Sequence, residues 1–173
     1  MSGTLVVQNL QGPASGANAN KIIVPAGQVL DASAGFVAPA GSVIQVVSFE
    51  TASITNTSST SFVASLITVS ITPSSATSKI LVTASTNGYA PVNYSMFYTF
   101  FRNNSVELSG GATGYGGHWI AGQRAVIPIT LTHLDSPNTT SATSYTVYFR
   151  GDGATVDTPD NGIATITAME IAG

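Results

Sequence analysis

Short runs that alternate hydrophobic and polar residues recur along the chain after residue 42, and turn-forming residues separate them. A period of two is typical of β-strands that bury one face. The runs that predict main strands are residues 43–51, 62–71, 79–89, 95–102, 106–108, 125–133, 145–149 and 163–171. No stretch shows the 3.6-residue apolar period and the capping residues of a helix. The pattern therefore predicts an all-β protein.

The number and spacing of these strands indicate how they assemble. Regularly spaced strands with turns between them predict an antiparallel sandwich or barrel, and eight strands are typical of a double-sheet jelly roll. An immunoglobulin-like sandwich is the alternative, although the chain lacks the cysteines of that framework. We expect a jelly-roll-like antiparallel β-sandwich with an extended N-terminal arm.

The first part of the chain differs in composition from the rest. Residues 11–20 are mostly small and are typical of a linker without packing capacity. The strand candidates on either side of it are too short to build a core within one chain. We therefore expect residues 1–41 to form an arm for attachment or intertwining, and residues 42–173 to form the sandwich.

Several predicted strands carry hydrophobic side chains on both faces, and a strand with one face in water would instead alternate. Residues 43–49 and 96–101 are the clearest cases. Burying an additional Val or Phe against another subunit contributes about 1.5–3 kcal/mol per side chain. The candidate oligomer-interface residues are Val43, Ile44, Val46, Phe97, Phe100 and Phe101.

Composition supports an oligomer and excludes several classes of protein. The 173-residue chain has a net charge of −3 and 8% charged residues, far below the roughly 25% of an ordinary soluble domain. The absence of cysteine excludes disulfides and thiolate chemistry. Five scattered Lys and Arg residues form no basic stripe, so we expect no nucleic-acid partner. No apolar run approaches the roughly 18 residues of a membrane span, and we expect neither a signal peptide nor membrane insertion.

A family resemblance rests on residues 39–47 (PAGSVIQVV), 71–82 (ITPSSATSKILV) and 163–171 (IATITAMEI). These segments resemble the C-terminal head domain of tailed-bacteriophage fibre proteins, of a type common in phages of marine and cyanobacterial hosts. Upstream, residues 23–33 (IVPAGQVLDAS) resemble the shaft or adaptor segments that precede such heads. These are strand and turn motifs, so the resemblance concerns architecture.

The resemblance implies a homotrimer in the virion, assembled in the host cytoplasm, with the N-terminal arm bound to other virion proteins. The chain leaves hardly any shaft, so a short tail fibre, a head fibre and a capsid decoration or cement protein all fit. A fibre would attach to the host surface, with a cell-surface glycan as a candidate ligand, whereas a cement protein would stabilise the head. A carbohydrate-binding or glycan-cleaving domain is a third alternative.

No motif in the sequence predicts catalysis. Glu50, Glu107 and Glu170 lie singly on predicted strands, and nothing pairs two carboxylates as glycoside hydrolysis requires. There is no Gly-x-Ser-x-Gly elbow, and His118 and His133 lack the spacing of a metal site. Arginines such as Arg150 are dispersed and are expected at solvated surface positions. We expect no enzyme activity and no cofactor.

The glycine-rich segment 109–119 holds Tyr115, His118 and Trp119. Amphipathic aromatic side chains of this kind are enriched at binding surfaces, and loops commonly carry function. Two interpretations follow. The segment forms a receptor or glycan site in which the rings pack on sugar faces, or its aromatic side chains pack at the subunit interface.

Three aspartates, Asp152, Asp157 and Asp160, lie in the predicted loop 151–162. Carboxylates on a flexible loop are the ligands that Ca²⁺ prefers. The ordered Asp-x-Asp-x-Asp-Gly pattern is missing, however, and Asp and Asn beside Gly are ordinary turn formers. We favour turn formation and expect no metal.

Overall fold

The computed structural model describes residues 13–17, 19, 21, 23, 25–27, 38–119, 121–122 and 125–173. Contacts divide the chain into two units, Met1–Val37 and Ala38–Gly173. The second unit begins slightly before the predicted start of the sandwich, because backbone hydrogen bonds join that segment to the C-terminus. The Gly41 N–H donates to the Ala172 carbonyl (2.8 Å), and the Ala172 N–H donates to the Ser42 carbonyl (2.9 Å). Most of the predicted arm lies outside the described residues.

The described part of Ala38–Gly173 forms eleven strands and no helix. The long strands are β1 (Val43–Thr51), β3 (Val63–Ile71), β4 (Lys79–Ala90), β5 (Ser95–Arg102), β8 (Ala125–Asp135), β9 (Thr143–Gly151) and β11 (Ala164–Ile171). The short strands are β2 (Thr55–Thr57), β6 (Val106–Glu107), β7 (Gly116–Trp119) and β10 (Val156–Thr158). All eight predicted strands are confirmed, with small shifts at their ends.

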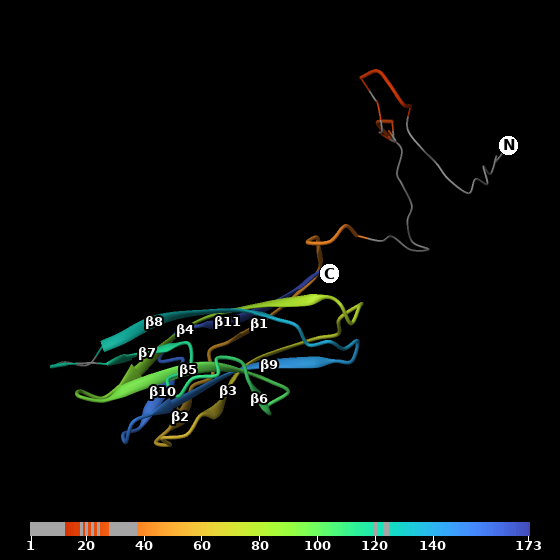
Figure 1. The fold of residues 1–173 in the computed structure, drawn as a ribbon. Helices are drawn as coiled ribbons and strands as arrows, with labels where there is room; N and C mark the ends of the chain where they lie inside the picture. The colour runs from red at the N-terminus through yellow and green to blue at the C-terminus, as the bar shows by residue number, and fades with distance from the viewer. Residues whose placement is uncertain are drawn as a thin grey trace. The chain divides into compact units, whose positions relative to one another are not determined.

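Two antiparallel sheets pack face to face, as Figure 1 shows. Sheet A has the order β1-β11-β4, with β8 paired along β4 and the short strands β10 and β2 continuing the sheet. Sheet B has the order β3-β9-β5, with β6 and β7 both paired to β5. The chain crosses between the sheets at every connection between consecutive long strands, which gives the double-sheet arrangement of a jelly roll.

The core lies between the two sheets and follows the period of two. In β4 every second residue is buried, and the same alternation runs through β3 and β11 and, apart from the buried Thr146, through β9. The largest fully buried side chains include Ile67, Tyr98, Phe100, Tyr145, Phe149 and Ile166. Side chains of the opposite phase, such as Arg150 and Tyr148, therefore lie on the outer faces.

Strand β1 departs from strict alternation at its first residues. Val43 pairs with Ile171 and Gln45 pairs with Glu170, so Ile44 is the additional residue of a β-bulge. The bulge places Val43 on the outer face. The alternating pattern had predicted that Val43 shares a face with Gln45, which is paired with the inward-facing Glu170. A one-residue irregularity exchanges the faces of every residue on one side of it.

Three strands, β2, β7 and β10, were not predicted. Each has only three or four residues (TNT, GGHW and VDT), too few to show the period of two. Such segments are strands here because a neighbouring strand offers them a hydrogen-bonding edge. β7 pairs with β5, and β10 joins β2 to β4.

Candidate functional site

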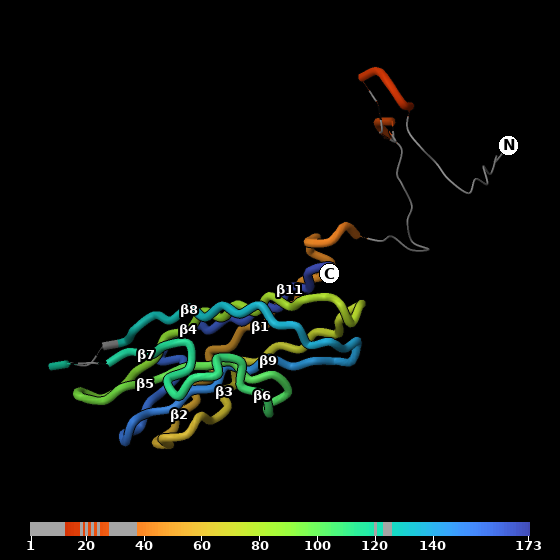
Figure 2. The backbone as a smooth tube through the Cα atoms, viewed as in Figure 1, coloured from red at the N-terminus to blue at the C-terminus, as the bar shows by residue number. Residues whose placement is uncertain are grey.

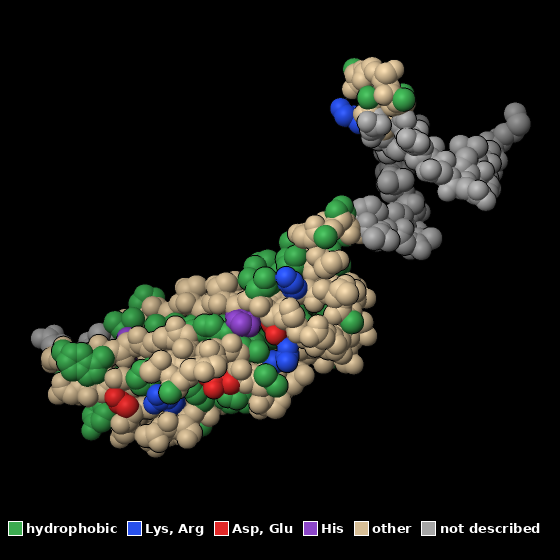
Figure 3. All heavy atoms as spheres, viewed as in Figure 1, with side chains coloured by type: hydrophobic (Ala, Val, Ile, Leu, Met, Phe, Trp, Pro, Cys, Tyr) green, Lys and Arg blue, Asp and Glu red, His purple; other side chains and the backbone are tan. Residues whose placement is uncertain are grey.

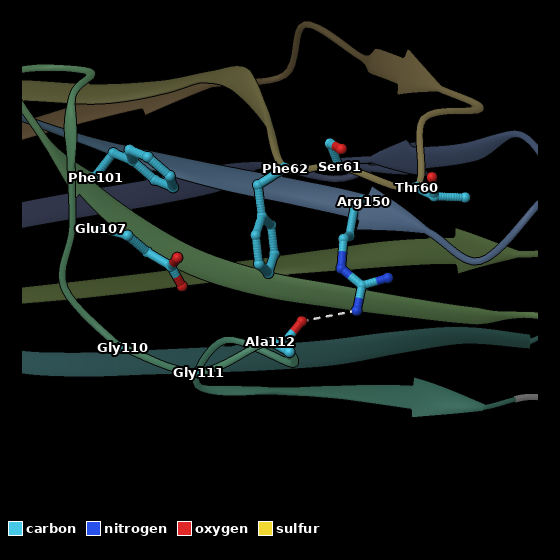
Figure 4. A pocket seen from close by; sticks show the side chains of 9 residues that line it. All are labelled: Thr60, Ser61, Phe62, Phe101, Glu107, Gly110, Gly111, Ala112 and Arg150. Carbon is cyan, nitrogen blue, oxygen red and sulfur yellow. Dashed lines mark hydrogen bonds between the residues drawn. The ribbon is translucent and has the colours of Figure 1, made fainter.

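A shallow hollow of about 650 Å³ lies on the outer face of sheet B, and we call it the sheet B groove. Its lining residues are Thr60, Ser61, Phe62, Phe101, Glu107, Gly110, Gly111, Ala112 and Arg150. Figure 4 shows the Phe62 ring between the Glu107 carboxylate and the Arg150 guanidinium. The groove therefore combines an aromatic surface with one charge of each sign.

Sheet pairing brings these residues together from distant parts of the sequence. Val63 of β3 pairs with Phe149 of β9, which places their chain neighbours Phe62 and Arg150 close to each other. Arg150 pairs in turn with Phe97 on β5. Because Phe149 is buried, the next residue, Arg150, points to the outer face.

The Arg150 guanidinium is held in place from several directions. Its carbon atom lies 4.2 Å from the centre of the Phe97 ring and 5.4 Å from the centre of the Phe62 ring. Nη1 donates to the Gly151 carbonyl (3.1 Å) and Nη2 donates to the Ala112 carbonyl (2.8 Å). Cation–π contacts and two backbone acceptors fix the orientation of the cation.

Glu107 is fixed at the other end of the groove. Its Oε1 accepts hydrogen bonds from the Ser109 hydroxyl (2.5 Å) and the Thr99 hydroxyl (3.3 Å). Next to it, the Phe101 ring stacks on Tyr148 with 4.0 Å between ring centres. The carboxylate and the aromatic ring are therefore both held in fixed orientations.

The loop that forms one wall of the groove is attached to β5. Figure 2 follows this segment from β6 along β5 into β7. The Leu108 N–H donates to the Phe100 carbonyl (3.0 Å) and the Tyr115 N–H donates to the Tyr98 carbonyl (2.8 Å). Gly114 has a φ of +66°, and a Cβ there would lie 2.1 Å from the Tyr98 carbonyl oxygen. Only glycine permits this close approach of the loop to the strand.

The three aromatic residues predicted as a ligand loop are not brought together. Tyr115 points inward, where its ring packs edge-on against Phe100 and its hydroxyl hydrogen-bonds to His133 Nδ1. His118 packs against Tyr98, and burial lowers its pKa. Trp119 is 61% exposed. The same glycine-rich segment instead supplies Gly110, Gly111 and Ala112 to the sheet B groove.

A polar cluster closes the sandwich near the end of β8. Asp135 accepts two hydrogen bonds from Arg102 Nη1, both 2.9 Å, and one from the Tyr145 hydroxyl (2.8 Å). Burial, with the hydrogen bond to Asp135, raises the pKa of Tyr145. Burial and the charges of Asp135 and Glu107 raise the pKa of Tyr115 to about 12. These groups face the interior, so the cluster is structural.

The three aspartates of the 151–162 segment make their contacts in different parts of the structure. Asp152 Oδ1 accepts from the Ser95 N–H (2.9 Å). Asp160 is buried, and its N–H donates to Asn87 Oδ1 (2.8 Å). Asp157 lies on β10, paired with Asn56 and Tyr89. Within the described ranges no three or more His, Asp or Glu side chains form a group able to hold a metal ion.

The outer face of sheet A carries a continuous apolar row that crosses four strands. The residues directly opposite one another from β1 through β11 and β4 to β8 are Val46, Met169, Leu81 and Leu134, and we call them the apolar row. Val46 is 56% exposed and Leu134 is 51% exposed. A row of four neighbouring hydrophobic side chains on an open face is a feature of interaction surfaces.

Hydroxyl-bearing residues follow the apolar row along the same face. The next row across the four strands consists of Ser48, Thr167, Thr83 and Thr132. Ser48 and Thr167 hydrogen-bond to each other at 3.0 Å.

The six candidate interface residues take different positions in the structure. Val43, Ile44 and Val46 are exposed on β1. Phe97 and Phe101 are half-buried on the outer face of sheet B. Phe100 is fully buried between the sheets, which removes it from the expected interface. Its side chain alternates inward with Tyr98, a pattern that the run of aromatic residues concealed.

Glu170 is a fully buried carboxylate on the inner face of β11. Its Oε1 accepts from the Ser74 N–H (2.8 Å) and hydroxyl (2.7 Å), and its Oε2 accepts from Gln45 Nε2 (2.6 Å). Burial alone would raise the pKa of Glu170, but these hydrogen bonds outweigh it and lower the pKa to about 2.

Glu170 is expected to make stability depend on pH in acid. Its pKa is lower in the folded protein (about 2) than in an unfolded chain (about 4.3). The contribution is therefore complete above about pH 4.3 and is lost as the pH falls toward 2, with a magnitude of at most about 3 kcal/mol. Denaturant unfolding from pH 2 to pH 7 measures it.

The control for this pH dependence is Glu170→Gln, which cannot ionise. The difference in unfolding free energy between wild type and Glu170→Gln should be constant above pH 5 and shrink below pH 4. Glu50→Gln changes an exposed carboxylate and should leave the profile unchanged. Parallel profiles for wild type and Glu170→Gln would contradict the lowered pKa.

Comparison of the chain with models of known protein families gives no match, and comparison with curated proteins gives none either.

In the part of the chain that the structure describes, no helix is long and apolar enough to cross a membrane.

Proposed function

We propose that the chain is a structural protein of a bacteriophage particle, the jelly-roll head of a short trimeric fibre that attaches the particle to its host. The proposal assigns the apolar row to contacts between copies and the outer face of sheet B to contacts with the host. Residues 1–37, a separate unit, would join the head to other virion proteins. The role is structural rather than catalytic.

The apolar row is the observation that carries this proposal. In a monomer Val46 and Leu134 would be exposed to water and Met169 and Leu81 half-exposed, although the chain has few charged residues (blue and red in Figure 3) with which to stay soluble. Packing this face on other copies removes the row from water and leaves the neighbouring Ser and Thr hydroxyls to pair across the contact. The jelly roll is itself an architecture of viral capsid and lectin domains, which supports the proposal by analogy of fold.

The mass of the purified full-length chain tests self-association. Light scattering at micromolar concentration should give three times the 17.6 kDa of one chain. The apolar row predicts that this mass persists at high salt, since hydrophobic contacts are not screened. A mass of 17.6 kDa at every concentration would rule out the trimer and the fibre together.

A capsid cement protein is the second candidate, because the same apolar row would also suit a module that clamps neighbouring capsomers. Particles stripped of the protein separate the two roles. Loss of adsorption with intact heads would support the fibre, whereas loss of capsid strength with normal adsorption would support cement. Particle images that locate the chain on the tail or on the head provide a direct readout.

A further inference from the structure

We infer that the sheet B groove is a binding site for a neutral saccharide, with Phe62 and Phe101 as the stacking surface and Glu107 and Arg150 as the polar anchors. The inference rests on the proposed function in one respect: it takes a glycan of the host surface as the source of the ligand. The chemical class of the ligand comes from the groove itself.

The aromatic part of the groove matches the apolar face of a sugar ring. Phe62 and Phe101 are half-buried, so part of each ring remains open to a ligand. The face of an aromatic ring carries partial negative charge, and the C–H groups on one side of a hexose carry partial positive charge. A hexose therefore packs flat on such a surface. The volume of about 650 Å³ lies within the range of small-ligand sites, about 300–1,000 Å³.

The charged part of the groove matches hydroxyl groups. An ionised carboxylate only accepts hydrogen bonds and a guanidinium only donates them. A sugar hydroxyl does both, so neighbouring hydroxyls can donate to Glu107 and accept from Arg150. Of the five N–H donors of a guanidinium, the described contacts of Arg150 use two. Both described hydrogen bonds to the Glu107 carboxylate go to Oε1, so Oε2 can accept a hydrogen bond from a ligand hydroxyl.

The balance of charge favours a neutral ligand over an acidic one. Arg150 alone would attract a carboxylate, sulfate or phosphate group, but Glu107 lines the same groove and repels it. The Arg150 cation is also partly satisfied by two carbonyls and two aromatic rings. Glu107 is the one carboxylate among the lining residues, so the pair needed for glycoside hydrolysis is not assembled here. The site therefore binds a saccharide and does not cleave it.

The groove is pre-organised, which reduces the entropy lost on binding. Hydrogen bonds hold Glu107 and Arg150, and the Phe101 ring is stacked on Tyr148. Each site alone would bind weakly, as expected for an open groove. Three copies on one fibre would raise the overall avidity by a factor of about 10²–10⁴.

A glycan array of neutral and acidic oligosaccharides, probed with the labelled full-length chain, tests the inference. Binding is expected to neutral hexose-containing glycans, and titration calorimetry then measures affinity for the best of them. Phe62→Ala and Glu107→Gln should each lower this affinity by about tenfold or more, since a hydrogen bond to a charged group and an aromatic contact are each of that size. Phe62→Leu should have an intermediate effect.

The matched controls are an exposed aromatic and an exposed glutamate away from the groove. Trp119→Ala and Glu50→Gln should leave the affinity unchanged, and thermal melting confirms that each variant is folded. No binding to any glycan, binding only to acidic glycans, or wild-type affinity in both Phe62→Ala and Glu107→Gln would overturn the inference. A change of oligomeric mass in the groove variants would overturn it as well, because the groove would then be a contact between copies.

This experiment separates the two proposals. A trimer that binds no saccharide would retain the fibre or cement role and refute the sheet B groove as a sugar site. A monomer that binds neutral glycans through Phe62 and Glu107 would refute the trimeric fibre and keep the site.

Discussion

Leu81→Glu is expected to reduce the solution mass of the chain from that of a trimer to the 17.6 kDa of a single copy. Leu81 lies in the middle of the apolar row, with Met169 opposite it on β11 and Leu134 opposite it on β8. A glutamate there would place one unpaired carboxylate per subunit in the contact between copies. Burying an unpaired charge costs several kcal/mol, which outweighs the gain from burying a leucine, about 1.5–3 kcal/mol.

Light scattering and a thermal melt together measure this effect. The isolated protomer should still fold, because Leu81 is on the outer face of sheet A and only half-buried. Leu66→Glu is the matched control, since Leu66 is 53% exposed on the outer face of sheet B. Leu66→Glu should keep the wild-type mass. An unchanged mass for Leu81→Glu would exclude the apolar row as the interface.

Asp135→Ala is expected to lower the free energy of unfolding by about 3 kcal/mol, a large share of the roughly 5–15 kcal/mol that stabilises a domain. Asp135 is 6% exposed and accepts from both Arg102 and Tyr145. Its removal leaves a cation and a hydroxyl without their acceptor at the margin of the core. This loss is at the lower end of the range for breaking a buried ion pair, about 3–5 kcal/mol, because the Arg102 side chain is 23% exposed.

Chemical denaturation of a double-mutant cycle tests this assignment. Arg102→Met combined with Asp135→Ala should recover part of the loss, since it also removes the cation that Asp135 neutralises. Asp152→Ala is the control, because that exposed aspartate accepts one hydrogen bond from the Ser95 N–H. It should cost about 1 kcal/mol. Additive losses in the cycle would show that Arg102 and Asp135 do not stabilise each other.

The period of two in the sequence was sufficient to predict the fold class. The long strands β3, β4, β9 and β11 alternate hydrophobic and polar residues, and a strand with one buried face must do so. Local pattern also predicted that Ile129 and Leu131 of β8 lie on its inner face, and both contact the core. What it did not predict was β7, whose strand conformation comes from pairing with β5 rather than from its own residues.

The sheet B groove could not be predicted in the same way. Phe62 and Arg150 are 88 positions apart in the sequence, and they become neighbours only through the pairing of Val63 with Phe149. Alternation did indicate that Arg150 points away from the core, because Phe149 is its buried neighbour. Which residues would face it across the sheet required the strand order.

The sequence by itself determined that the chain is all-β, that its strands bury one face, and that it has too few charges for its hydrophobic content. These properties depend on neighbouring residues and on composition. Only the tertiary structure decided which side chains share an outer surface. It aligned Val46, Met169, Leu81 and Leu134 into one row, moved Phe100 into the core and joined Glu107 to Arg150 across a groove. The physical reason is that strand register is set by long-range pairing, and a shift of one residue moves every side chain to the other face.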